Sequence, residues 1–519
     1  MHLRSAALHS IRFETLRSKT VELVLKEGVL ITLLLAAVLP VQMVLSASFY
    51  LLTRNFWLDE IVTDVLVSDQ SVSHSLGAIA GGLDTNPPVY HLLLRAFCRL
   101  VGHGGETTLR LFSLFSVLAA LVALYVNLRE IYLPLTALAG VFAVWSHPLL
   151  LRCAFRARMY APWFAAVVWF AYLLGRSWNA SPQMWVRLLL ACLSFLTCTL
   201  QTVGALSLGI VLAANLLFHH SAKWDWNTIG WASLGAVAFL AWIPFLWKQN
   251  FANPVTWIKA PTLRNIADFA SGILIPRLLA TTILFGVGLA VFFEGSSATL
   301  RTLGNGSSNF STPFGLAALI VLPIVLIAFS ILVQPLLDDR YAIPAVAAFA
   351  PTIAAVVSPL SPSWLAALLA MFFMISATHL FRLSNSSRAE DRKTAELIEA
   401  IRRNTSQETV FFERLHELTV VSRYAKDIAE RCYALDFEAG HVGGVDELLI
   451  ANRNHARLFL RFYSCFNMMP WESARRLPRL FLVPSVEAAL EESCSSLETR
   501  YKDFKVLPLE AGLYELTRG

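Results

Sequence analysis

The stretch Phe56-Trp57-Leu58-Asp59-Glu60-Ile61-Val62 follows the first long apolar run of the chain, which extends from about Gly28 to Leu52. That run is long enough to cross a bilayer and too long for the core of a signal peptide. Basic residues outnumber acidic ones in positions 1–27, so we expect a cytoplasmic N-terminus and place the acidic pair on the outer face of the membrane. The chain is therefore predicted to be a membrane protein whose first external loop carries carboxylates.

The composition of the whole chain extends this prediction. Of the 519 residues, 56% are hydrophobic and 15% are charged, and the mean hydropathy is +0.58, which is typical of a polytopic α-helical membrane protein. The apolar segment 89–101 is too short to span and carries two arginines, so we expect it at the membrane surface. About eleven stretches, including the first run, reach spanning length. Because this number is odd, we expect the C-terminus outside, opposite the N-terminus. The other ten stretches centre near Val117, Val141, Val168, Leu193, Ile210, Val237, Thr282, Val325, Ala347 and Leu369.

Charged residues divide the chain into a membrane part and a soluble part. Positions 381–519 hold 41 of the 78 charged residues. Short β-type runs alternate there with amphipathic segments, which indicates a compact soluble α/β domain. We therefore predict three parts: a cytoplasmic segment (1–27), a transmembrane domain (28–381) with an outer loop at 53–106, and a C-terminal α/β domain outside the membrane (382–519).

The outer loop holds the densest group of acids in the membrane half. Five of the 15 acidic residues in the first 380 positions lie between positions 59 and 84, namely Asp59, Glu60, Asp64, Asp69 and Asp84. A carboxylate at a membrane edge is costly to keep and marks a functional site, although a simply solvated loop is the alternative. The apolar neighbours of Asp59 and Glu60 favour the functional interpretation, with Asp59 as a general base.

Several short motifs, in order along the membrane half, resemble one known family. They are Trp57-Leu58-Asp59-Glu60, Asp84-Thr85-Asn86-Pro87-Pro88-Val89-Tyr90, Leu109-Arg110-Leu111-Phe112-Ser113, Phe155-Arg156-Ala157-Arg158-Met159-Tyr160-Ala161 and Asp339-Arg340-Tyr341-Ala342-Ile343-Pro344. Together they resemble the GT-C superfamily of membrane glycosyltransferases, and within it glycosyltransferase family 39, the protein O-mannosyltransferases and aminoarabinose transferases. The chain departs from the family at Asn86, where members have His or Lys before the proline pair.

The resemblance implies transfer of a sugar from a polyprenyl-phosphate donor to an acceptor hydroxyl at the outer face of a bacterial cytoplasmic membrane. Asp59 would be the base, with Glu60 and Asp84 as further catalytic carboxylates. Cations must stabilise the departing lipid phosphate, and the candidate substrate-binding residues are Arg156, Arg158, Tyr160, Arg340 and Tyr341. We expect Arg158 and Arg340 to converge on that phosphate. The alternative for Arg158 is an anchor whose charge reaches the membrane surface from a helix end. The alternative for Arg340 is a local ion pair with Asp338 or Asp339.

Other functions are distinguishable in principle. A transporter or lipid flippase would carry charges within its spans, and a polysaccharide polymerase or ligase would lack the acidic pair of the loop. The net charge of +6 is diffuse and does not indicate nucleic acid, and the chain has no Walker A, GxGxxG or HExxH motif. The sequence names neither a cofactor nor the sugar or acceptor. It leaves open a divalent metal cation, for which Asp59 and Asp84 would be the oxygen ligands.

Overall fold

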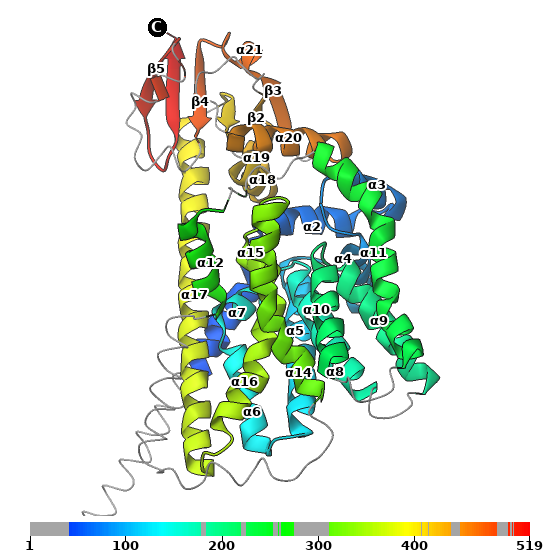
Figure 1. Ribbon diagram of the computed structural model, residues 1–519. Coiled ribbons are helices and arrows are strands. Elements are labelled where there is room, and N and C mark those ends of the chain that lie inside the picture. Colours follow the sequence, from blue (N-terminus) through cyan, green and yellow to red (C-terminus); the bar gives the residue numbers. More distant parts are fainter. Residues whose placement is uncertain are drawn as a thin grey trace, which may run out of the picture.

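The structure of the chain is a computed structural model. It describes residues 41–177, 183–218, 225–252, 258, 261–274, 311–405, 407–413, 415–436, 447–464, 466–484, 497, 498, 501 and 503–518. Apolar helices form a long bundle, and a small sheet stands at one end of it (Figure 1). The predicted span near Thr282 and the N-terminal segment lie outside the described residues.

Helices of the bundle follow the apolar runs of the sequence. Five of those described are long and apolar enough to cross a membrane, in the segments Glu106–Arg129, Trp226–Gln249, Phe314–Leu332, Asp339–Val357 and Pro362–Asn404. The helices of the bundle are α5 (Glu106–Arg129), α6 (Pro134–Trp145), α7 (Pro148–Ala154), α8 (Tyr160–Ser177), α9 (Met184–Thr199), α10 (Gly204–Phe218), α11 (Trp226–Ala252), α12 (Leu263–Leu274), α14 (Ser311–Ala318), η1 (Leu319–Val321), α15 (Leu322–Leu332), η2 (Asp339–Ala348), α16 (Phe349–Val357) and α17 (Pro362–Asn404). The multi-span prediction agrees with this architecture, while the count of eleven stays a prediction.

One predicted span is broken. Around Val141 the chain forms α6 and α7, which meet at an angle of 73°. The break falls at His147 and Pro148, where the proline has no N–H to continue the first helix and instead begins the second. The bend carries the end of α7 toward the outer loop, and the loop residues 155–159 that follow it enter the candidate site described below.

The outer loop folds into three short helices, α2 (Leu58–Ser68), α3 (Val72–Ala80) and α4 (Val89–Val101). Asp59 and Glu60 occupy the first turn of α2, where the helix dipole favours negative charge. The third helix has the bounds expected for the interfacial segment and ends at Gly102, whose φ of 84° suits glycine.

Helix α17 links the membrane part to the soluble part without a break. Its 43 residues extend roughly 65 Å at the standard rise of an α-helix, about twice the hydrocarbon thickness of a bilayer. It runs along the bundle and up to the sheet (Figure 1). The predicted boundary at 381/382 therefore falls inside a continuous helix.

The C-terminal part is an α/β domain, as predicted. Its sheet has the order β3-β2-β1-β4-β6-β5, in which the first four strands are parallel and the last two pair antiparallel. The strands are β1 (Val410–Phe412), β2 (Cys432–Asp436), β3 (Asn467–Pro470), β4 (Arg479–Val483), β5 (Phe504–Pro508) and β6 (Tyr514–Arg518). Helices α18 (Leu415–Tyr424), α19 (Lys426–Ala429), α20 (Glu447–Phe462) and α21 (Trp471–Ala474) connect them.

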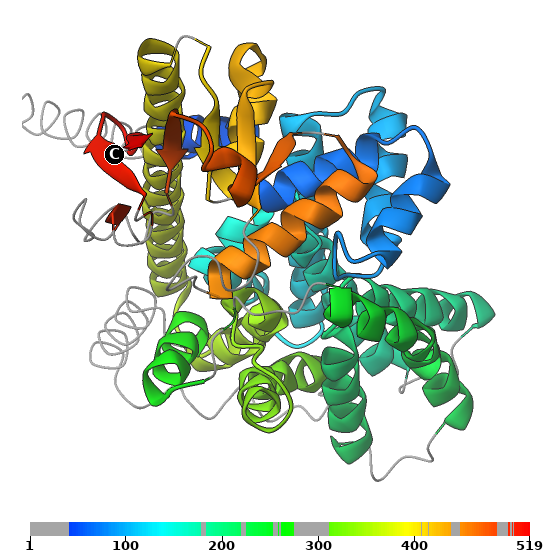
Figure 2. The same ribbon diagram turned by 90° about the horizontal axis from the view of Figure 1, so that it is seen from above.

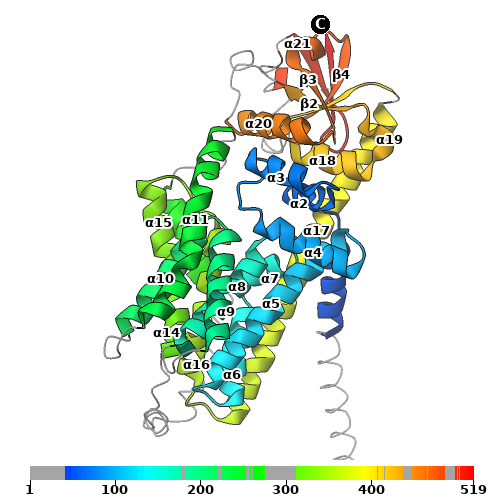
Figure 3. The same ribbon diagram turned by 90° about the vertical axis from the view of Figure 1, so that its right-hand side faces the viewer.

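The soluble domain packs directly on the outer loop. One apolar cluster joins Val62 and Leu66 of α2, Ile79 of α3 and Phe459 of α20 with the strand residue Phe412. Helix α20 lies over α2 and α3 in the side view (Figure 3) and crosses the middle of the molecule when seen from above (Figure 2). The loop is thus enclosed between the membrane helices and the soluble domain.

Candidate functional site

The acidic pair at the start of α2 divides into one buried and one accessible carboxylate. Glu60 is fully buried and accepts hydrogen bonds from Nε and Nη2 of Arg110, at 2.9 and 2.7 Å, and from the N–H of Ala157 at 2.8 Å. Burial alone would raise the pKa of Glu60, but the charge and hydrogen bonds of Arg110, the charge of Arg54 and the N–H of Ala157 together outweigh it, and the pKa is lowered. Glu60 thereby fixes the loop after α7 against α2.

Asp84, at the end of the outer loop, is also buried in a network. Its Oδ2 accepts from Nη1 of Arg158 at 3.0 Å, and its Oδ1 accepts from the side chain of Asn86 at 2.8 Å. His91 lies 3.5 Å from the same carboxylate. Burial raises the pKa of Asp84, but the Arg158 charge and these polar neighbours hold it well below its usual range. Asn86, the position at which the sequence departs from the motif it resembles, thus supports the Asp84 carboxylate.

Asp59 differs from both, because 29% of its side chain is exposed. Its Oδ2 lies 3.4 Å from Nη1 of Arg340, and its main-chain carbonyl accepts from Nη1 of Arg158 at 3.2 Å. Arg340 is also held by Asp338, the N-cap of η2, at 2.9 Å from Nε. Arg158 and Arg340 therefore converge on Asp59, although 182 positions separate them in sequence.

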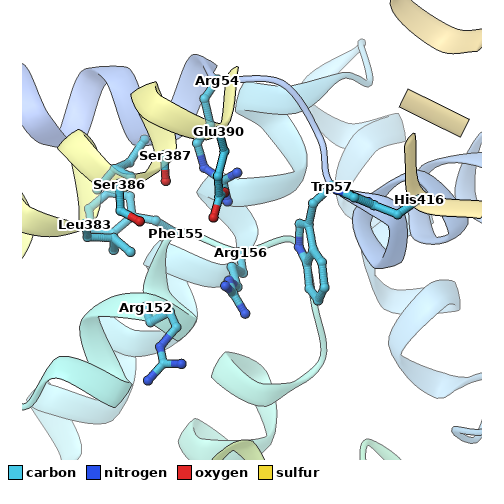
Figure 4. A pocket seen from close by; sticks show the side chains of 11 residues that line it. Arg54, Trp57, Arg152, Phe155, Arg156, Leu383, Ser386, Ser387, Glu390 and His416 are labelled. Atoms are coloured by element: carbon cyan, nitrogen blue, oxygen red, sulfur yellow. The ribbon is translucent and has the colours of Figure 1, made fainter. Parts of the chain in front are cut away.

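A cavity of about 380 Å³ adjoins this group, on the side where Trp57 stands (Figure 4). The guanidinium carbon of Arg156 lies 4.7 Å from the centre of the Trp57 ring, and that of Arg340 lies 6.0 Å from it. Among the described residues, Arg156 has no carboxylate partner. We call the cavity the arginine pocket; it is lined by Leu51, Arg54, Trp57, Arg152, Phe155, Arg156, Leu383, Ser386, Ser387, Glu390 and His416.

The other arginines of the pocket are partly neutralised. Arg54 lies 3.6 Å from Glu60, and Arg152 pairs with Asp339 at 2.9 Å while about a third of each side chain stays exposed. Three guanidinium groups with one lining carboxylate, Glu390, give the pocket a net positive charge. Such a pocket suits an anionic group with several oxygens, because guanidinium forks match phosphate and carboxylate geometry.

The structure brings most of the candidate site residues to one place. Tyr160 begins α8 with its ring 5.6 Å below the Arg340 guanidinium, and Tyr341 follows Arg340 half-buried in η2. Sequence reasoning missed Arg54, Arg110 and Arg152. A signal existed for each, since Arg54 ends the first apolar run, Arg110 lies in a quoted motif and Arg152 precedes another.

A divalent cation does not fit the two acids proposed as its ligands. Arg158 contacts the Asp84 carboxylate and the Asp59 carbonyl, so a positive charge already stands between Asp59 and Asp84. Over the described parts of the chain, no group of three His, Cys, Asp or Glu side chains is arranged to hold a metal. We derive no metal-assisted step.

Comparison with known proteins gives a fold. No family model matches the chain, and no curated protein matches it. The chain is similar in structure to two solved structures of ArnT from Cupriavidus metallidurans, one bound to undecaprenyl phosphate and one in the apo state. Each is 14% identical to this chain, covers 92% of it and 97% of the ArnT chain, and superposes with a TM-score of 0.55. The chain therefore shares the fold of these ArnT structures, in agreement with the resemblance that its motifs indicated.

Proposed function

We propose that the protein is a glycosyltransferase that moves a sugar from a polyprenyl-phosphate-linked donor to an acceptor hydroxyl at the outer face of a bacterial cytoplasmic membrane. One observation carries the proposal. Of the carboxylates of Asp59, Glu60 and Asp84, Asp59 alone is accessible, and it stands beside a pocket of arginines. The ArnT fold, one example of which binds undecaprenyl phosphate, supports a lipid-linked donor.

Asp59 is suited to accept the proton of the acceptor hydroxyl. Its Oδ2 faces Arg340, while Oδ1 has no hydrogen-bond partner in the described structure. A base must reach the proton that it takes within hydrogen-bond distance, and an exposed carboxylate oxygen meets that requirement. Glu60 and Asp84 contact Arg110 and Arg158 instead, so we assign them to positioning the site.

The arginines also fall into two kinds: Arg110 and Arg158 hold the buried carboxylates, and others are available to bind the lipid phosphate. As the glycosidic bond breaks, its electron pair stays on the phosphate oxygen, and the negative charge there increases. Cations fixed in advance near that oxygen lower the barrier, since they need no reorganisation during the reaction. Arg156, which lacks a carboxylate partner among described residues, is the candidate for this contact, with Arg152 and Arg54 beside it. Arg340 and Arg158 contact Asp59 instead, and Tyr160 lies under Arg340; with Tyr341 they stay candidates for binding the substrate beside Asp59.

The topology follows from the same reasoning. The loop that contains Asp59 packs against the soluble domain, so both lie on one side of the membrane. With the basic N-terminal segment cytoplasmic, that side is the outer one. Cysteine labelling at the exposed positions 70 and 426 from outside the cell, but not at position 129, would match this orientation.

The test is mass analysis of lipid-linked sugars and surface glycans from cells with and without the gene. Loss of the protein should remove one glycan modification and raise one polyprenyl-phosphate sugar. Asp59→Asn should lower transfer by about 10²–10⁴-fold, the usual contribution of a general base, while Asp427→Asn on the surface of the soluble domain should restore full activity. Unchanged glycans and lipid-linked sugars in the deletion strain would contradict the proposal.

A further inference from the structure

Helix α20 of the soluble domain forms a roof over the outer loop (Figure 3). Near its end Phe462 packs on Gly81, where an added Cβ would come within 2.7 Å of the phenyl ring. Tyr463 donates a hydrogen bond to Asp69 at 2.7 Å, and the His74 ring meets Tyr463 edge to face at 5.1 Å. These contacts fix the face of α20 that is turned toward the loop.

His455 lies on that face. Positions 455, 459 and 462 are spaced by four and three residues, so they share one side of the helix, and the rings of His455 and Phe459 lie 6.5 Å apart. Nε2 of His455 is inaccessible to solvent and has no hydrogen-bond partner in the described structure. A buried polar atom of this kind carries a substantial cost, which a ligand would offset.

The charges that act on His455 belong to the candidate site. Burial lowers the pKa of His455, the carboxylates of Asp59 and Asp84 oppose that effect, and Arg158 reinforces it. The net lowering keeps the imidazole neutral near pH 7. A neutral imidazole donates one hydrogen bond and accepts one, which suits a hydroxyl group better than an anion.

Other buried polar atoms near Asp84 and Trp57 also lack partners among the residues described. They are the hydroxyl of Tyr90, Nδ1 of His91 and Oε1 of Gln249. Gln249 reaches this place from α11 and donates to the Asp84 carbonyl at 3.2 Å. The set mixes neutral donors and acceptors, in contrast to the cationic lining of the arginine pocket.

We infer that His455 hydrogen-bonds a hydroxyl of the sugar moiety of the donor, so that the soluble domain supplies part of the sugar-binding site. The inference rests on the proposed function and adds that the phosphate and the sugar of the donor bind at different places. The phosphate binds in the arginine pocket, and the sugar binds beneath α20 against neutral polar groups. Sugar recognition then requires the soluble domain, whereas carrier recognition does not use His455.

The test measures dissociation constants of the full-length protein in nanodiscs, by tryptophan fluorescence. The probes are undecaprenyl phosphate and a panel of undecaprenyl-phosphate pentoses and hexoses. The wild type should bind at least one sugar-linked form more tightly than the bare carrier. His455→Ala should reduce that advantage by about 5-fold, since a lost hydrogen bond costs on the order of 1 kcal/mol, and leave binding of undecaprenyl phosphate unchanged. His455→Gln should recover part of the advantage.

Arg457→Ala is the matched control, because Arg457 lies two positions away on α20 and pairs with Asp436 at the surface. It should bind every probe like the wild type. An unchanged sugar advantage in His455→Ala, or equal loss of carrier and sugar-linked binding, overturns the inference alone. A wild type that binds no carrier at all overturns the proposed function as well.

Discussion

The charged residues around Trp57 form two groups that differ in how far their charges are neutralised. Glu60 with Arg110 and Asp84 with Arg158 are buried and joined at 2.7 and 3.0 Å. Asp59 and Arg156 stand at the edge of the arginine pocket, the first loosely paired and the second without a carboxylate in the described residues. We infer that the first group builds the site and the second performs the chemistry, because a charge already neutralised has little left for a substrate.

Breaking the buried group should have the largest effect. Arg110→Met removes the bidentate partner of the buried Glu60 carboxylate and leaves it only Arg54 at 3.6 Å and the N–H of Ala157; breaking a buried pair typically costs about 3–5 kcal/mol. We expect the free energy of unfolding to fall by that amount, measured by chemical denaturation in detergent.

The double variant Glu60→Gln with Arg110→Met is the control for this prediction. It removes both charges, so it should lose less stability than Arg110→Met alone. A single variant as stable as the wild type would mean that the pair is not part of the structural core of the site.

Asp84→Asn should have the next largest effect. We expect the free energy of unfolding to fall by about 3 kcal/mol at pH 7, because Arg158 loses its buried carboxylate partner. The folded-state pKa of Asp84 is depressed, so its stabilisation is complete above the unfolded pKa of about 4 and is lost as the pH falls below that value. The variant should therefore show a smaller loss of stability between pH 5 and pH 3 than the wild type. Equal pH profiles in thermal unfolding would contradict the assignment.

Much of this arrangement could be predicted from the sequence, and its limits have physical causes. Apolar runs and the charge-rich tail indicate a helical membrane protein with an α/β domain, because spanning length and charge density are local properties. The motifs around Asp59, Arg158 and Arg340 could be assigned to one site by resemblance. The pairing of Glu60 with Arg110 could not, since 50 positions separate them and nothing in either motif orients the side chains.

The soluble domain shows the same limit more strongly. His455 is a single histidine in a segment without a motif, and its role depends on how α20 docks on the loop. That docking depends on apolar contacts such as Phe462 with Gly81, which no sequence period reveals. The boundary expected at 382 falls inside α17 for a related reason, since the hydrophobic pattern ends there while the helix continues.

Removing a charge from the second group, Asp59 and Arg156, should weaken substrate binding and leave the free energy of unfolding nearly unchanged. Arg156→Gln should weaken binding of undecaprenyl phosphate by about 10-fold or more, because a hydrogen bond to a charged group contributes on the order of 1.5–3 kcal/mol. Arg461→Gln, on the soluble domain, should bind like the wild type. A structural rather than a binding role would appear as a fall in the free energy of unfolding with no change in the dissociation constant.

The smallest effect is expected at the ion pair between the soluble domain and the outer loop. Arg423 of α18 contacts Asp64 of α2 at 2.7 Å, with 27% of the arginine side chain exposed. Partly exposed pairs usually contribute less than about 1 kcal/mol, whereas the same interface buries Val62, Leu66 and Phe459 in an apolar cluster. Arg423→Gln should therefore leave the domain docked, and 1 M salt, which shortens the Debye screening length to about 3 Å, should not release it. Hydrogen exchange of the α20 amides measures the docking directly. Strong deprotection of α20 in Arg423→Gln or at high salt would show that the roof is held by charge, and that its contacts with the loop are weaker than the apolar packing implies.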